Sequence, residues 1–202
     1  VKAGDVIEIK ALTYDPANPW AAPAGDVTVN LAYKEVVLPS GSATLKFSTV
    51  NLQLESDLTV NFIAYSDVFA AGNYTNPRAE FAITDVLSGE VRTATVTDFI
   101  SASSGTRMWF GFKGLSPRMM KGEITATLYG TYEGQEYSST IKYAATKYCY
   151  NQFKKDDAEL KAVVADLLNF ATAHQINAGH DVENLINAEM TDLHKSFASS
   201  YE

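Results

Sequence analysis

Three histidines near the C-terminal end are the first residues whose type could support chemistry. His174, His180 and His194 fall within 21 residues, and three imidazoles can hold a catalytic zinc ion. Their spacings of 6 and 14 residues do not match the i, i+4 pair of a helical zinc motif, and no neighbouring cysteine or glutamate completes a ligand set. We therefore expect solvent-exposed or capping histidines in preference to a metal site, and no cofactor.

Nucleophiles are the second kind of candidate. Cys149, the single cysteine, excludes an intrachain disulfide and a Cys-rich metal site. It falls on the apolar flank of a predicted helix, which favours a small buried side chain over a nucleophile. Neither Ser139-Thr140 nor the serine-rich segment 101–105 has the Gly-x-Ser-x-Gly context of a nucleophile elbow. The sequence therefore predicts no hydrolytic centre.

Six carboxylates lie at the ends of predicted strands. A glycosidase would need two of them opposed across a cleft, whereas acidic side chains at strand ends commonly keep turns soluble. No Asp-x-Asp-x-Asp-Gly loop is present, so calcium binding is a minor alternative. We expect exposed turn carboxylates at Glu55, Asp57, Asp67, Asp85, Glu90 and Asp98.

Aromatic residues are the strongest candidates for binding, because sugar rings stack on exposed tryptophan and tyrosine. In the segment Arg107–Lys113, alternation places Trp109 on one face together with Arg107 and Lys113. A flat ring between two cations is costly to bury and suited to stacking, with donors on either side for hydroxyls or carboxylates. We predict an outward Trp109 at the centre of a ligand-binding surface.

Other aromatic residues extend this set, although packing in the core or in strands is their more ordinary role. Trp20 lies in a Pro-rich loop that can tuck against the core. The predicted ligand-binding residues are Trp109, Arg107, Lys113, Trp20 and Tyr74, and Tyr132 and Tyr137 are further candidates.

The spacing of apolar residues, which predicts the elements that position these side chains, changes once along the chain. The chain has 202 residues, of which 46% are hydrophobic, enough for a globular core in one or two domains. Up to about residue 137 the pattern alternates and is interrupted by turn residues, which is typical of antiparallel strands. We predict an immunoglobulin-like or jelly-roll-like β-sandwich with strands at Asp5–Leu12, Val27–Tyr33, Ala43–Leu54, Leu58–Tyr65, Arg78–Val86, Glu90–Thr97, Arg107–Lys113 and Glu123–Tyr129.

Helical spacing is predicted from residue 138 onward. Asp156 or Asp157 can cap a helix to about Ala173, with an apolar stripe at Leu160, Val163, Val164, Leu167, Leu168 and Ala171. A loop at 174–180, a short helix at 182–188 and a helix or linker-like end at 191–201 follow. The fold class is mainly β with two to three C-terminal helices packed on the sandwich.

The domain prediction places the sandwich at 1–137 and the helical segment at 138–202. Residues 1–40 are two added strands of the sandwich or the end of a preceding module. The chain opens with Val-Lys-Ala-Gly and without a signal peptide, so we expect a fragment or a mature product.

Charge and hydropathy exclude other function classes. The formal net charge is −8 and no basic cluster stands apart from acidic or apolar sequence, which disfavours nucleic acid and anionic membranes. No run approaches the roughly 20 apolar residues of a spanning helix, so we expect no membrane insertion.

Several segments also resemble a known module in the same order along the chain. They are VNLQLESDLTVNFIAY at 50–65, LSPRMMKGEITATLY at 115–129, YSSTIKYA at 137–144, LKAVVADLLNFATA at 160–173 and NLINAEMT at 184–191. They resemble an uncharacterised module repeated in large secreted or wall-attached proteins of gut and rumen Clostridia. The resemblance spans roughly residues 45–192. It departs at 175–180, where this chain lacks the aromatic turn of that module.

What the resemblance implies is an extracellular, secreted or cell-wall-associated module without catalytic residues. We expect a noncatalytic role in adhesion, in assembly or as a spacer, with other modules, surface proteins or glycans as partners. A carbohydrate-binding module using exposed aromatic rings is the alternative. A polysaccharide hydrolase is a third, less favoured class.

Overall fold

The computed structural model describes residues 6–12, 26–32, 44–55, 57–101 and 104–199. The chain divides into two compact units, Val1–Leu38 and Pro39–Glu202. In the first unit, β1 (Val6–Leu12) and β2 (Asp26–Ala32) form an antiparallel two-stranded sheet of their own. Both strands were expected from the alternating pattern, and they are not part of either sheet of the second unit.

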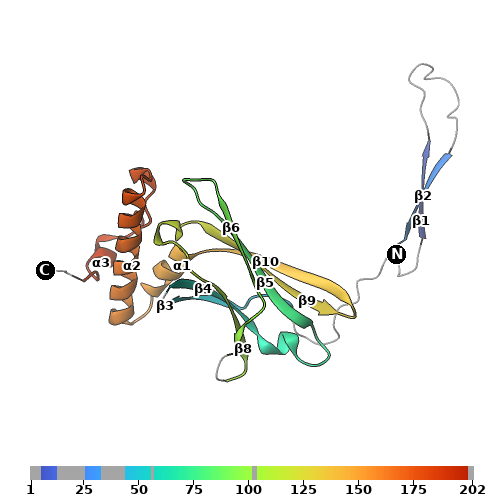
Figure 1. The fold of residues 1–202 in the computed structure, drawn as a ribbon, viewed down its shortest axis with the longest axis horizontal. Coiled ribbons are helices and arrows are strands. Elements are labelled where there is room, and N and C mark those ends of the chain that lie inside the picture. Colours follow the sequence, from blue (N-terminus) through green and yellow to red (C-terminus); the bar gives the residue numbers. More distant parts are fainter. Residues whose placement is uncertain (1–5, 13–25, 33–43, 56, 102–103, 200–202) are drawn as a thin grey trace, which may run out of the picture. The chain divides into compact units, whose positions relative to one another are not determined.

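The described residues of the second unit form two four-stranded antiparallel sheets (Figure 1). The first sheet has the order β3-β4-β8-β7, with β3 at Thr49–Leu54, β4 at Leu58–Tyr65, β8 at Arg107–Phe112 and β7 at Ile100–Ser101. The second sheet has the order β10-β9-β5-β6, with β10 at Gln135–Ala144, β9 at Glu123–Tyr132, β5 at Thr75–Thr84 and β6 at Val91–Val96. The predicted class, an antiparallel sandwich with C-terminal helices, is confirmed.

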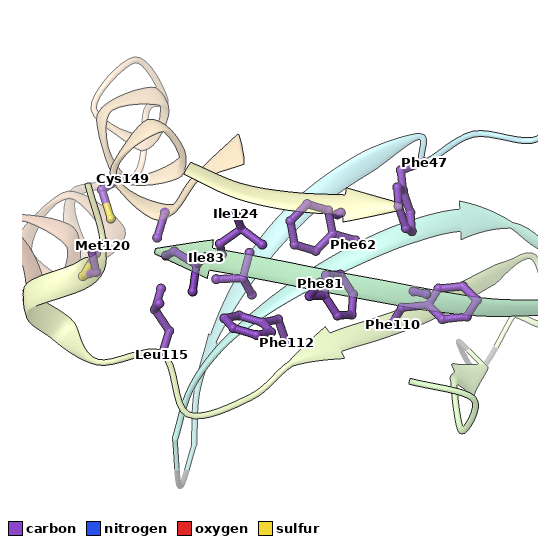
Figure 2. Packing of buried hydrophobic residues seen from close by; sticks show 14 of the residues in the cluster. Phe47, Phe62, Phe81, Ile83, Phe110, Phe112, Leu115, Met120, Ile124 and Cys149 are labelled. Carbon is purple, nitrogen blue, oxygen red and sulfur yellow. The ribbon is translucent and has the colours of Figure 1, made fainter. Parts of the chain in front are cut away.

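Aromatic rings from both sheets fill the space between them. Phe62 of β4 lies 5.2 Å from Phe81 of β5, and Phe81 lies 5.6 Å from Phe112 of β8, between ring centroids. Figure 2 shows these rings next to one another between the strands, with their planes tilted. Burying such side chains is worth about 1.5–3 kcal/mol each, so this layer fixes which face of each strand points outward.

Arg92 closes one edge of this core. It points inward from the edge strand β6, and its guanidinium lies 4.7 Å from the centroid of the Phe112 ring. The same group donates hydrogen bonds to the carbonyl oxygens of Lys113 and Gly114, just after β8. These hydrogen bonds connect the Arg92 side chain of the second sheet to the main chain that follows β8 of the first sheet.

The predicted start of the helical segment at residue 138 was wrong. Residues 138–144 belong to β10, which pairs with β9 and alternates between half-buried and exposed positions. Tyr137, Ile141 and Tyr143 point inward on this strand with a period of two. The strand runs into the helix without an intervening turn, so the i, i+4 spacing of Ile141 in β10 and Ala145 in α1 joined two different elements into one apparent helix.

The helices lie at one end of the sandwich (Figure 1). They are α1 (Ala145–Gln152), α2 (Ala158–Asn177) and α3 (Asp192–Lys195). The described residues also form short 3-10 turns, which are η1 (Ser66–Phe69), η2 (Pro117–Met119) and η3 (Val182–Asn184). Asp157 caps α2, as predicted, by accepting from the Leu160 amide at 2.9 Å. No helix in the described part of the chain is long and apolar enough to cross a membrane.

The apolar stripe of α2 is buried along only one of its edges. Val164, Leu168 and Ala171 are buried in the same cluster as Met120 and Cys149, whereas Val163 is 47% exposed. The helix continues to Asn177 and so takes up the first half of the predicted 174–180 loop. It stops two residues before Gly179, whose φ of +82° favours glycine.

Candidate functional site

The candidate site is the outer face of the first sheet, the side turned away from the core. Strand pairing defines it: Thr49 lies opposite Ile63, which lies opposite Trp109, and Asn51 lies opposite Asn61, which lies opposite Gly111. We call this surface the amide face, because side-chain amides line its centre. Its described residues are Thr49, Asn51, Gln53, Thr59, Asn61, Ile63, Tyr65, Arg107, Trp109 and Gly111.

The predicted outward position of Trp109 is confirmed. Met108, Phe110 and Phe112 are buried in the core, and Trp109 and Arg107 occupy the alternate positions of β8. The Trp109 ring is half-buried because it lies between its cross-strand neighbours, Ile63 and Ile100. Its indole Nε1 is buried and has no hydrogen-bond partner among the described residues.

A row of amides lies beside this ring. The Asn61 Nδ2 donates to Gln53 Oε1 at 3.2 Å, and Asn61 is buried although it faces outward. A Cβ on Gly111 would lie 3.0 Å from Asn61 Oδ1, so the Asn61 amide reaches over the glycine. Asn51 Oδ1 is a second buried atom without a partner among the described residues.

Cations and a second aromatic ring border the row. Tyr65 is 49% exposed and pairs with the exposed Arg107 at one end of β4 and β8. Lys113 is exposed and follows the other end of β8. This arrangement supplies what binding a hydroxylated ring requires: aromatic surfaces, amide donors and acceptors, and cationic donors at the border.

Tyr74 does not belong to this site, and its prediction as an exposed platform was wrong. The side chain is 5% exposed and contacts Tyr132 and Tyr137 with ring centroids 6.3 and 5.7 Å away. Burial, with a smaller contribution from Tyr137, raises its pKa above the ordinary value of tyrosine. Gly130 makes room for it, since a Cβ there would lie 2.9 Å from Tyr74 Cβ. Trp20 lies outside the described residues.

The histidines are far from forming one cluster of ligands. His174 is exposed, and its ring lies edge-on to Phe170 with centroids 4.5 Å apart. His194 stacks on Phe153 at 4.1 Å and completes the capping box of α3 with Thr191. In the described part of the chain, no group of three or more His, Cys, Asp or Glu residues is placed to hold a metal ion.

The remaining candidates, Cys149 and Asp85, lie in environments that favour a role in the fold. Burial raises the pKa of the Cys149 thiol to about 12, as expected for a buried small side chain and not for a nucleophile. Asp85 departs from the expected exposed carboxylates: it is 7% exposed and forms an ion pair with Arg118. The pKa of Asp85 is lowered by the hydrogen bond from the Leu87 amide and then by Arg118.

Sequence reasoning found Trp109, Arg107 and Lys113 but missed the amides and Tyr65. The alternation within Leu58–Tyr65 places Thr59, Asn61, Ile63 and Tyr65 on one face, so the signal for that strand was present. The sequence did not reveal the strand order β3-β4-β8, which places Leu58–Tyr65 beside Arg107–Phe112.

Comparison with known proteins assigns this chain to no family. No protein-family model, curated protein or solved structure matches this chain. The resemblance to the clostridial surface module therefore stays a prediction, and the function must be argued from the geometry of the amide face.

Proposed function

We propose that this chain is a noncatalytic binding module that recognises a neutral glycan on the amide face. The observation that carries the proposal is the juxtaposition of the half-buried Trp109 ring with the row of Asn51, Gln53 and Asn61. Sugar rings offer apolar C–H faces to aromatic surfaces and hydroxyls to amides, and this face provides both on one sheet. An extracellular, wall-associated setting is part of the proposal and is supported by the sequence resemblance alone.

Unpartnered polar atoms on the same face support a ligand. The Trp109 Nε1 and Asn51 Oδ1 lack hydrogen-bond partners among the described residues, and leaving a buried polar atom unpaired costs about 1–3 kcal/mol. Such a cost is commonly tolerated where a ligand completes the bond. The Asn61 amide is already held by Gln53 and therefore needs little ordering when a hydroxyl arrives.

The test is retardation of the full chain in native gels containing soluble neutral polysaccharide, with β-glucan and xylan as separate probes. Trp109→Ala should weaken retardation by about fivefold or more, since a lost aromatic stacking contact is worth about 1 kcal/mol. Phe170→Ala is the matched control, because Phe170 is an exposed ring on α2 outside the amide face. It should leave retardation unchanged.

A second variant separates binding from folding. Trp109→Phe keeps an aromatic ring over Ile63 and removes an N–H that has no partner, so it should fold like the parent and bind more weakly. If neither polysaccharide retards the parent chain, or if Trp109→Ala folds and binds like the parent, the glycan proposal is overturned. Binding to wall preparations without glycan retardation would instead support an adhesive or assembly role.

A further inference from the structure

A concave site lies at the end of the sandwich that contacts the helices. It is a pocket of about 400 Å³ between the β5–β6 turn, the segment from η2 to β9, and the end of α2 with η3. None of its lining residues belongs to the amide face. The lining is Thr84, Asp85, Val86, Leu87, Arg118, Met119, Lys121, Gly122, Gln175, His180, Asp181 and Asn184. Its volume is within the usual range for small-molecule sites, roughly 300–1,000 Å³.

Some of the charged side chains that line this pocket form an ion pair, and others bond only to neutral groups in the described part of the chain. Asp85 is fully engaged: one carboxylate oxygen accepts from the Leu87 amide at 2.9 Å and the other from Arg118. Asp181 caps η3 by accepting from the Glu183 amide at 3.1 Å. Lys121 has no ion pair among the described residues. Its Nζ donates to Asn184 Oδ1 at 2.6 Å and to the Leu185 carbonyl oxygen at 3.4 Å, and both acceptors are neutral.

His180 adds an unpaired polar atom to the same lining. Its Nε2 is buried and has no hydrogen-bond partner among the described residues. A buried ring nitrogen without a partner is costly unless a ligand supplies one. Met119 and the exposed side chains of Val86 and Leu87 provide an apolar wall beside these polar groups.

We propose that this pocket binds a small carboxylic acid. The carboxylate lies against Lys121 and His180, and the apolar body of the ligand lies against Met119 and the Val86–Leu87 turn. Lys121 supplies a charge that forms no ion pair with a described carboxylate, and a charge-assisted hydrogen bond is roughly twice as strong as a neutral one. The site is separate from the proposed glycan face, and each can fail without the other.

Two acids with matched neutral partners test the proposal by nuclear magnetic resonance titration of the full chain. N-acetylleucine and its amide represent a carboxylate on an aliphatic body, and glucuronate and glucose represent one on a sugar. We expect at least one acid to bind about tenfold or more tightly than its neutral partner. Shifts should centre on the Met119 methyl group and the His180 ring, and the preferred acid identifies the source of the carboxylate.

Two variants and one control complete the experiment. His180→Leu removes the unpaired nitrogen without breaking a described hydrogen bond, so it should fold like the parent and lose most of the acid preference. Lys121→Met should abolish that preference, whereas Lys142→Met, at an exposed position of β10, should not change it. The proposal is overturned if neither acid binds up to about 10 mM, a range that covers weak millimolar sites. It is also overturned if the folded Lys121→Met chain keeps the preference.

Discussion

The outer faces of the two sheets use their polar side chains in opposite ways. On the second sheet, Arg78 forms ion pairs with Glu80 at 3.2 Å and with Glu136, and its guanidinium carbon lies 4.0 Å from the centroid of the Tyr129 ring. The Tyr129 hydroxyl donates to Glu80 at 3.0 Å, which closes the network. On the amide face, Trp109 Nε1 and Asn51 Oδ1 have no described partner.

This difference distinguishes a stabilising surface from the proposed recognition surface. Both faces come from strands with the same alternation, so alternation alone does not tell them apart. On the second sheet the carboxylates, the guanidinium and the phenol satisfy one another. On the amide face the outward residues described on β3, β4 and β8 include no carboxylate, and two buried polar atoms have no described hydrogen-bond partner. Unsatisfied hydrogen-bonding atoms, more than polarity, therefore mark the candidate site.

Adding one methyl group to each sheet should give the largest contrast. Gly130→Ala places a Cβ 2.9 Å from Tyr74 Cβ and 3.2 Å from the Phe69 ring, so it should cost about 1–3 kcal/mol in the free energy of unfolding and leave glycan binding intact. Gly111→Ala brings its Cβ closest to the side chains of Asn61 and Thr59, which can shift, so it should cost less and weaken binding. Urea denaturation and gel retardation measure both. The reverse ranking would contradict the comparison.

Removing an unpaired atom should stabilise the chain. Asn51→Leu deletes the buried Oδ1 that has no described partner, and we expect a gain of about 1 kcal/mol in the free energy of unfolding together with weaker glycan binding. Urea denaturation checks the first effect and gel retardation the second. A loss of stability would mean that the Asn51 amide is satisfied in the free chain.

Substituting one arginine on each face should give smaller effects on stability and binding that differ between the two faces. Arg78→Met breaks two partly exposed ion pairs and should cost under about 1 kcal/mol without changing glycan binding. Arg107→Met removes an exposed cation at the border of the amide face and should weaken binding without a measurable change in stability. Equal effects of the two variants on binding would show that recognition is not confined to the amide face.

The smallest expected effect is on pH dependence. The hydrogen bond from Arg78 lowers the pKa of Glu136 below its ordinary value of 4.5. Because the pKa is depressed in the folded state, the stabilisation by Glu136 is complete above that ordinary value and is lost as pH falls through the folded pKa. Carboxyl-carbon resonances should show Glu136 titrating below its ordinary value, and Arg78→Met, which removes the hydrogen bond, should move that titration to higher pH. Glycan binding between about pH 5 and 8 should stay constant, because the described amide face contains no carboxylate.

Local alternation made much of the sandwich predictable. The strand Leu58–Tyr65 has the predicted bounds, and the outward position of Trp109 follows from the period of two around Phe110. The failure at β10 has a local cause as well. Ser139 lies at an inward position between Tyr137 and Ile141 and weakens the alternation, and α1 begins at Ala145 directly after β10 ends. Because no turn residue separates them, the apolar residues of the strand and of the helix form one pattern with apparent helical spacing.

The composition of the candidate site could be predicted only in part. The residues of β8 are contiguous, so Trp109 and Arg107 could be grouped from the sequence. Asn51 and Asn61 reach the same surface only because β4 pairs with both β3 and β8 in a particular register. Register across strands nearly 50 residues apart depends on how the core rings pack, which a single sequence does not encode locally. The same reason explains why Tyr74 was predicted outside the core that buries it.

Arg92 has a consequence for how copies of this module behave when crowded. An edge strand with open backbone groups invites another chain to add a strand, and an inward-pointing charge on that edge opposes such addition. Arg92 supplies this charge on β6 and is held there by the Lys113 and Gly114 carbonyl oxygens. A neighbouring chain that paired with β6 would have to accommodate this inward-pointing cation beside the added strand. Dense arrays of this sandwich should therefore resist edge-to-edge aggregation along β6.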